Sequence, residues 1–289
     1  MLAGMKTIRQ LTVESLAHMA AQGSPRAVVD ESARAILREW MLHPRKAAEP
    51  APPAPPAAKA AALPPVQPVQ PVQPKPAAAE MGVEEKLAYL RERALHWKPA
   101  LALGTLREKM VFATGDPHAR LMLVGEAPGY DEERLGEPFV GRAGQKLNQV
   151  LAAMGLGRGA VYISNICKWR PAMGPQQGMA NRPPTAEEIA ACVQLVLAEI
   201  RAIRPQCIVC LGGTAAKGLL GVENASVGSL RGKWHDCQGV PVRVTYHPSY
   251  LLRNESLSAR RAVWEDMLAA MEALGMPVSE KQRRYFLPS

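Results

Sequence analysis

The sequence predicts an α/β fold: a three-layer sandwich with a central, mostly parallel four-stranded sheet flanked by helices, plus a short N-terminal helical segment. Two observations support this prediction. From about residue 81 onward, short apolar runs alternate with segments of helical spacing, which is typical of β-α units around a parallel sheet. In addition, 47% of the 289 residues are hydrophobic, which is enough to bury a sizeable core.

Four short apolar runs are the predicted strands, because each ends in glycine or polar residues as a buried parallel strand does. They cover residues 121–124, 161–164, 207–211 and 242–245. Helical spacing then predicts a helix after each strand, over 142–154, 185–203, 213–220 and 259–274. The second of these helices opens on Thr185, with Glu187 and Glu188 in its first turn, which predicts a capped start.

The chain before this region has a different composition. Residues 1–45 show helical spacing in two short stretches and form the predicted N-terminal helical segment, which is too small to fold firmly alone. Residues 46–80 form a linker rich in Pro, Ala and Gln, which favours extended polyproline II over a packed core. We expect the linker to be a semi-rigid spacer, with a docking site for a protein partner as the alternative. Residues 81–275 make the main domain, and residues 276–289 a basic C-terminal tail.

The chain is basic, with 35 Lys and Arg against 26 Asp and Glu and a formal charge of +9. This excess fits a polyanionic partner, because phosphate contacts supply most of the non-specific affinity for nucleic acids; solubility alone would also account for it. The sequence has no apolar run long enough for a membrane span or a signal peptide. We therefore expect a cytoplasmic monomer of bacterial type, with access to nucleoid DNA and no membrane partner. The five cysteines, an odd number, argue against a disulfide framework.

Each predicted strand ends in a polar or glycine-rich feature. Residues 125–129 (GEAPG) follow the first strand, Asn165 the second, residues 212–213 (GG) the third and residues 247–249 (HPS) the fourth. The carboxyl ends of parallel strands meet at one edge of a sheet, where ligands bind in open α/β folds. The four features are therefore expected to converge on one site.

The blocks around these strand ends resemble the uracil-DNA glycosylase superfamily, and most of all its family 4, between about residues 111 and 271. The matching blocks are GEAPGYDEERLGEPFVGRAG (125–144), YISNICKWRP (162–171), NRPPTAEEIAAC (181–192), IVCLG (208–212), LRGKW (230–234) and TYHPSYLLR (245–253). Their number and order argue against coincidence. The resemblance implies a DNA glycosylase that flips uracil out of DNA and hydrolyses its N-glycosidic bond, leaving an abasic site that initiates base excision repair.

The resemblance implies a base-binding pocket made by the first two blocks. Asn165 corresponds to the residue that reads uracil, since a carboxamide offers a donor and an acceptor that match uracil O4 and N3–H. Phe139 corresponds to the aromatic platform that stacks on the flipped base. Gly125, Ala127 and Gly129 complete the expected substrate-binding set.

The same resemblance implies the catalytic residues. His247 would donate a hydrogen bond to uracil O2, where charge accumulates as the base departs, and either protonation state could do this. Glu126 is the candidate for orienting water or balancing the oxocarbenium charge. The best-studied branch of the superfamily has an aspartate one position later, where this chain has Ala127. Glu132, which matches a second acidic position of family 4, is the rival, or it shapes the pocket to exclude the methyl group of thymine.

A third set corresponds to DNA-binding residues. In the loop 249–253, Leu251 is the expected apolar wedge that fills the gap left by the flipped nucleotide. Ser249 lies beside it, and Arg253 is expected to grip an adjacent phosphate. A phosphate-binding rim is expected from the basic residues in the matching blocks: Arg231 with Arg142, Lys168, Arg170, Arg182 and Lys233.

The cysteines depart from the family 4 pattern. That family holds a 4Fe–4S cluster with four cysteines, whereas here only Cys192 matches a ligand position; Trp169 replaces another, and residues 91–110 contain no cysteine. Four thiolates are the normal requirement of such a cluster. We therefore expect no cofactor and no metal, with packed side chains such as Trp169 and Trp97 in the place of the cluster.

Two other functions stay open at this point. A catalytically silent DNA-binding member of the same superfamily would keep the fold and the basic rim, although it has no need for Asn165, Phe139, His247 and Glu126. A small-molecule α/β enzyme could bind phosphate at residues 211–213, although neither complete glycine-rich nucleotide motif is present.

Overall fold

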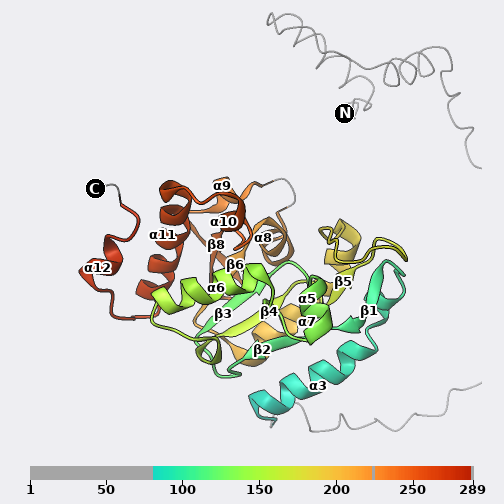
Figure 1. Cartoon of the computed structure of the whole chain (residues 1–289). Helices are drawn as coiled ribbons and strands as arrows, with labels where there is room; N and C mark the ends of the chain where they lie inside the picture. The colour runs from blue at the N-terminus through green and yellow to red at the C-terminus, as the bar shows by residue number, and fades with distance from the viewer. Residues whose placement is uncertain (1–80, 223–224, 288–289) are drawn as a thin grey trace, which may run out of the picture. The chain divides into compact units, whose positions relative to one another are not determined.

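The computed structural model describes residues 81–222 and 225–287 (Figure 1). The expected N-terminal helical segment (1–45) and linker (46–80) lie outside the described residues and stay predictions. Within the described residues, no helix is long and apolar enough to cross a membrane.

Helices and strands alternate along most of the described chain. The helices are α3 (Val83–Leu95), α4 (Lys98–Leu101), α5 (Tyr130–Leu135), α6 (Arg142–Ala153), α7 (Ala186–Ile203), α8 (Gly213–Leu220), α9 (Val227–Leu230), α10 (Tyr250–Arg253), α11 (Leu257–Ala273) and α12 (Glu280–Arg283), with a 3-10 turn η1 (Arg158–Ala160). The strands are β1 (Leu106–Met110), β2 (Ala113–Gly115), β3 (Leu121–Gly125), β4 (Tyr162–Asn165), β5 (Trp169–Pro171), β6 (Cys207–Leu211), β7 (Trp234–Cys237) and β8 (Val240–Thr245).

The central sheet has six strands in the order β2-β4-β3-β6-β8-β7, and β1 and β5 pair separately. The inner four strands are parallel and are the four that the sequence predicted. The two edge strands are antiparallel additions, so the prediction of a four-stranded sheet was too small. Neither edge strand has an apolar run to reveal it, because β2 is three residues long and β7 is largely polar and exposed.

Helices cover both faces of the sheet (Figure 1). Because successive side chains of a strand point to opposite faces, β3 contributes to two cores. Leu121 and Leu123 belong to the core that includes residues of α6 and α11. Met122 and Val124 belong to the core that includes residues of α3, α7 and α8. The fold is therefore α/β with a mixed sheet flanked by helices, and both faces of β3 are buried.

The start of α7 has the cap that the sequence predicts. The Thr185 hydroxyl accepts a hydrogen bond from the Glu188 N–H at 3.2 Å, and the Glu188 carboxylate accepts one from the Thr185 N–H at 2.8 Å. Glu188 is buried and also binds both terminal nitrogens of Arg182, at 2.6 and 2.7 Å. This pair fixes the entrance to α7 beside the site described below.

The C-terminal residues, expected as a basic tail, make hydrogen bonds with the domain. The indole N–H of Trp264 in α11 donates to the Gln282 carbonyl at 2.6 Å, and the Gln282 amide donates to the Ala153 carbonyl of α6 at 2.9 Å. Tyr285 packs against Trp264 with ring centroids 5.3 Å apart. Gln282 and Tyr285 therefore attach the C-terminal segment to the domain, despite the basic composition of the segment.

Candidate active site

A cavity of about 320 Å³ opens at the carboxyl edge of the sheet. Glu126 follows β3, Asn165 ends β4 and His247 follows β8, and all three line the cavity. The end of β6 lies beside them: Gly212 has a φ of +99°, and a β-carbon there would lie 3.0 Å from His247 Cβ. The predicted convergence of the four strand ends is therefore confirmed by the geometry. Ala127 and Gly129 also line this cavity, as expected.

Asn165 is buried in the wall of the cavity, with 2% of its surface exposed. Its side-chain oxygen Oδ1 has no hydrogen-bond partner among the described residues. A β-carbon on Gly125 would lie 2.4 Å from both Asn165 Oδ1 and Phe139 Cζ, so the glycine permits the amide and the ring to approach the strand. Leaving a buried acceptor unpaired costs about 1–3 kcal/mol. A ligand that donates a hydrogen bond to this oxygen would remove that cost.

Phe139 adopts a backbone conformation that large side chains rarely adopt, with a φ of +56°. Two side chains hold its loop. Arg158 donates to the Phe139 carbonyl at 3.0 Å, and Glu132 Oε1 accepts from the N–H groups of Val140 at 3.0 Å and Gly141 at 2.9 Å. The surrounding contacts therefore fix the position of the ring at the cavity.

Glu132 has both carboxylate oxygens engaged by the backbone. In addition to the two contacts of Oε1, its Oε2 accepts from the Gly129 N–H at 3.1 Å and so caps the start of α5. Glu126 is different, since Oε2 accepts from the Thr214 hydroxyl at 2.5 Å and Oε1 has no hydrogen-bond partner among the described residues. This geometry favours Glu126 over Glu132 as the carboxylate that can face a substrate.

The hydrogen bonds of His247 define its tautomer. The Ser249 N–H donates to His247 Nδ1 at 3.2 Å, and the Ser249 hydroxyl lies 2.8 Å from the same nitrogen. With Nδ1 accepting, a neutral ring carries its proton on Nε2. Burial, together with the positive charge of Arg253, lowers the pKa of His247 from 6.5 to about 4. The imidazole is therefore a neutral donor at pH 7, and its ring centroid lies 5.7 Å from that of Phe139.

Sequence reasoning missed three residues of this site: Arg158, Thr214 and Asn181. Asn181 lines the cavity, and its Oδ1 accepts from Arg170 at 2.8 Å. Asn181 is the first residue of the matched block 181–192, so the resemblance could have indicated it as a site residue. Thr214 directly follows the glycine pair at the end of β6, which was itself expected at the site, although the threonine was not singled out. Arg158 lies outside every matched block, so no motif indicated it.

The expected DNA-binding residues divide into two groups. Ser249 and the exposed Arg253 line the cavity. Leu251 is only 6% exposed and packs into the core, so the structure does not present it as the surface wedge that we expected. Arg231 is bound to the buried Asp266 at 2.6 Å and to a carbonyl of α11, which holds it away from the expected phosphate-binding rim.

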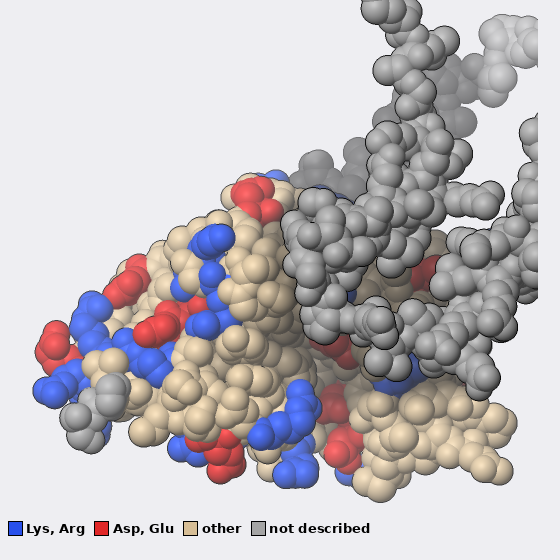
Figure 2. Space-filling view, turned by 90° about the horizontal axis from the view of Figure 1, so that it is seen from above, with Lys and Arg blue, Asp and Glu red and all other residues tan. Residues whose placement is uncertain are grey.

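Of three other basic residues of the expected rim, Lys168 and Arg170 turn inward, whereas Arg182 lines the active-site cavity. Each forms an ion pair with a buried carboxylate: Lys168 with Glu199 at 2.6 Å, Arg170 with Glu133 at 2.9 Å, and Arg182 with Glu188 at 2.6 Å. Arg142 and Lys233 are exposed, as expected. On the part of the face visible in Figure 2, Lys and Arg are interspersed with Asp and Glu. Net charge alone therefore does not define a DNA path.

The cysteines do not provide the ligands of a 4Fe–4S cluster. Cys167 and Cys192 are fully buried in one core with Trp169, and Trp97 packs against this core and donates to the Ala191 carbonyl at 2.6 Å. A hydrogen bond between the two thiols, together with burial, raises the pKa of Cys167 and so disfavours its thiolate, whereas the same hydrogen bond lowers the pKa of Cys192. Among the described residues, no group of three or more His, Cys, Asp or Glu could hold a metal ion. These side chains do not fit a cluster that needs four thiolates.

Comparison with known proteins agrees with this geometry. Residues 112–268, more than half of the chain, match the profile of the uracil DNA glycosylase superfamily. The chain belongs to the uracil-DNA glycosylase superfamily. Curated relatives of this superfamily member include the Type-4 uracil-DNA glycosylase of Thermotoga maritima, which is 44% identical over 56% of this chain and 81% of the relative. Those of Archaeoglobus fulgidus and Pyrobaculum aerophilum are 41% and 38% identical, over 50% and 52% of this chain and 72% and 77% of the relatives. The predicted resemblance to family 4 is thus confirmed.

Proposed function

We propose that this superfamily member is a uracil-DNA glycosylase that takes a flipped uracil into the 320 Å³ cavity and hydrolyses its N-glycosidic bond. The product is an abasic site, which starts base excision repair. The observation that carries the proposal is the combination of a buried, unpartnered Asn165 Oδ1 with a neutral His247 in one cavity. The names of the three relatives described above, each a Type-4 uracil-DNA glycosylase, support the same substrate class.

Asn165 supplies the base specificity. Its Oδ1 accepts from uracil N3–H, and its amide N–H donates to uracil O4. Cytosine has an acceptor at N3 and a donor at N4, so both interactions would become repulsive. Phe139 provides an apolar face for the base, and extrusion from the stack costs a few kcal/mol that these contacts must offset.

His247 and Glu126 supply the chemistry. As the bond between C1′ and N1 breaks, the electron pair leaves with N1 and negative charge spreads to uracil O2. The Nε2–H of neutral His247 donates to O2 and stabilises that charge without a change in its own protonation. Glu126, held by Thr214, orients the water that adds to C1′ and balances the positive charge that develops on the sugar.

We further propose that the chain works as a monomer without a 4Fe–4S cluster. Burial of Cys167 and Cys192 among tryptophan side chains supports this, because these two cysteines would supply only two of the four thiolates that such a cluster needs. Protein purified without added iron should be colourless and fully active. Two results together would contradict the absence of a cluster: stoichiometric iron with visible absorbance in the purified protein, and loss of the iron, the absorbance and the activity on chelation.

A panel of oligonucleotides tests the function. The substrates are single-stranded uracil, U:A and U:G pairs, and hypoxanthine, each treated with wild type, Asn165→Ala and His247→Ala. We expect the wild type to cut at least one uracil substrate, and each variant to be slower by about 100-fold or more, as when one charge-stabilising donor is removed. Binding without excision in the whole panel would instead identify the silent DNA-binding member of the superfamily.

A further inference from the structure

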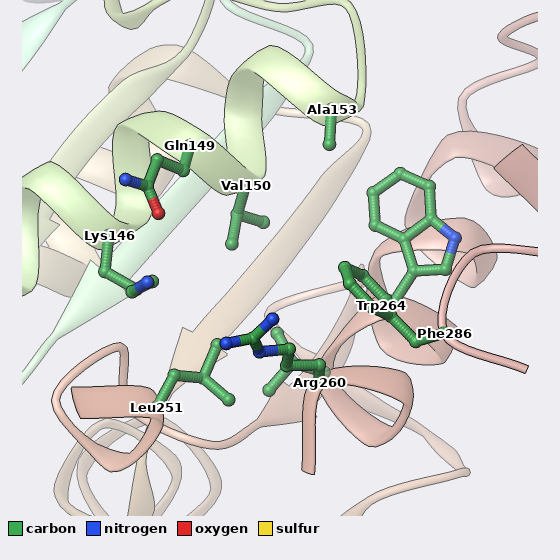
Figure 3. A pocket seen from close by; sticks show the side chains of 9 residues that line it. Lys146, Gln149, Val150, Ala153, Leu251, Arg260, Trp264 and Phe286 are labelled. Atoms are coloured by element: carbon green, nitrogen blue, oxygen red, sulfur yellow. The ribbon is translucent and has the colours of Figure 1, made fainter. Parts of the chain in front are cut away.

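A second cavity, of about 330 Å³, lies between α6 and α11, with one side closed by the C-terminal segment (Figure 3). Its two ends differ in chemistry. Lys146 of α6 and Arg260 of α11 point toward one end, next to Leu251, whereas Trp264 and Phe286 lie at the other (Figure 3). The volume is at the low end of the range for ligand pockets, about 300–1,000 Å³, so it suits one small planar group.

The basic end has little internal compensation. The nearest carboxylate of Arg260 is that of Glu255, at 3.7 Å, and the side chains are 39% and 69% exposed. Among the described residues, Lys146 has no carboxylate partner within 4 Å. Two cations that share few neighbouring anions attract an anionic ligand such as a phosphate. The aromatic end offers a surface on which a nucleobase can stack.

The second cavity shares a wall with the proposed uracil pocket. Leu251 lines the second cavity, while Ser249 and Arg253 line the first. All three lie in or next to α10, a single helical turn about 6 Å long. A strand that places one base in the first cavity would thus carry its flanking nucleotide past the mouth of the second.

From this arrangement we infer that the second cavity binds a nucleotide flanking the uracil in single-stranded DNA. Its base stacks on Phe286 beside Trp264, and its phosphate lies between Lys146 and Arg260. The inference rests on the proposed function for the identity of the strand. It also gives Leu251 a role in the wall between two nucleotide sites, in place of a surface wedge, and it gives the packed C-terminal segment a function, because that segment supplies Phe286.

The first experiment measures affinity for single-stranded DNA by fluorescence anisotropy across a salt series. The double variant Lys146→Gln/Arg260→Gln is compared with Arg91→Gln/Lys98→Gln, which makes the same change of charge at exposed positions of α3 and α4, on the opposite side of the sheet. We expect the first double variant to bind about tenfold more weakly and its salt slope to fall by about 0.7, since it loses the contact with one single-strand phosphate. Equal affinities and slopes for the two double variants would overturn the inference.

The second experiment locates the base. 2-Aminopurine is placed at successive positions on either side of a 2′-fluoro-deoxyuridine, which resists hydrolysis because fluorine destabilises positive charge on the sugar. Fluorescence should be quenched by stacking at one offset from the uracil. Phe286→Ala should abolish that quenching and weaken binding about fivefold or more, as expected for the loss of one base–aromatic stack. Quenching at no offset, or quenching that Phe286→Ala leaves unchanged, would contradict the inference.

A third measurement separates this inference from the proposed function. Binding of a thymine-only oligonucleotide needs the phosphate site but not uracil excision. If the wild type excises no uracil but Lys146→Gln/Arg260→Gln still weakens thymine-strand binding relative to its control, the flanking site stands and the glycosylase proposal falls. If excision is normal and DNA affinity is unchanged in that variant, the cavity serves another occupant, such as a peptide, and the inference falls.

Discussion

Replacing His247 by glutamine should change how the stability of the protein depends on pH. In the folded chain, burial and Arg253 lower the pKa of His247 to about 4, whereas the unfolded chain titrates near 6.5. Between these values the unfolded state binds more protons, so the stability of the wild type decreases as the pH falls. The shift of about 2.5 units corresponds to about 3 kcal/mol in total, and to about 2.5 kcal/mol by pH 4.5.

The assay is urea unfolding of wild type and His247→Gln at pH 7 and at pH 4.5. The free energy of unfolding of the wild type should decrease by about 2.5 kcal/mol more than that of the variant, because the other titrating groups cancel in the difference. A long-range ¹H–¹⁵N spectrum at pH 7 should also show the ring proton on Nε2. Equal pH dependence of the two proteins, or a proton on Nδ1, would refute the assignment of His247 as a buried neutral donor.

Three further substitutions test the positions of the other groups. Gly125→Ala should slow uracil excision by tenfold or more while the fold persists by circular dichroism, because the new methyl would lie 2.4 Å from Asn165 Oδ1; wild-type rates would contradict the tight approach. Thr214→Ala should lower kcat more than it raises KM, and Thr214→Ser should restore kcat, since the hydroxyl holds Glu126. Lys168→Met should lower the free energy of unfolding in urea by about 3–5 kcal/mol, because it leaves the buried Glu199 carboxylate without its ion-pair partner. A loss below about 1 kcal/mol would show that the ion pair contributes little to stability.

The sequence predicts the central part of the fold well. The four inner strands and the helices α6, α7, α8 and α11 are recovered because each has a strong apolar pattern. The edge strands and the one-turn helices lack such a pattern and depend on tertiary contacts. The contacts that Tyr285 and Gln282 of the C-terminal segment make with α11 and α6 were not predicted, because the basic composition of the segment gives no apolar pattern.

In the candidate site, too, some residues could be predicted from the sequence and others depend on tertiary contacts. The strand-end residues Asn165 and His247 could be placed from topology alone, because parallel strands deliver their ends to one edge. The directions in which the basic side chains point could not be predicted from the sequence. Lys168 and Arg231 look like surface cations in the sequence, yet both meet buried carboxylates contributed by helices distant in the chain. A pattern of residue types shows the charge and the spacing of side chains. It does not show which distant residue becomes the ion-pair partner once the chain has folded.

The most direct test of the central claim is release of free uracil under single-turnover conditions, with the enzyme in excess over an oligonucleotide that carries one uracil. We predict one equivalent of free uracil by mass spectrometry and an equal amount of alkali-labile abasic site, both strongly reduced with Asn165→Ala. An oligonucleotide that stays intact while bound to the wild-type protein would contradict the account.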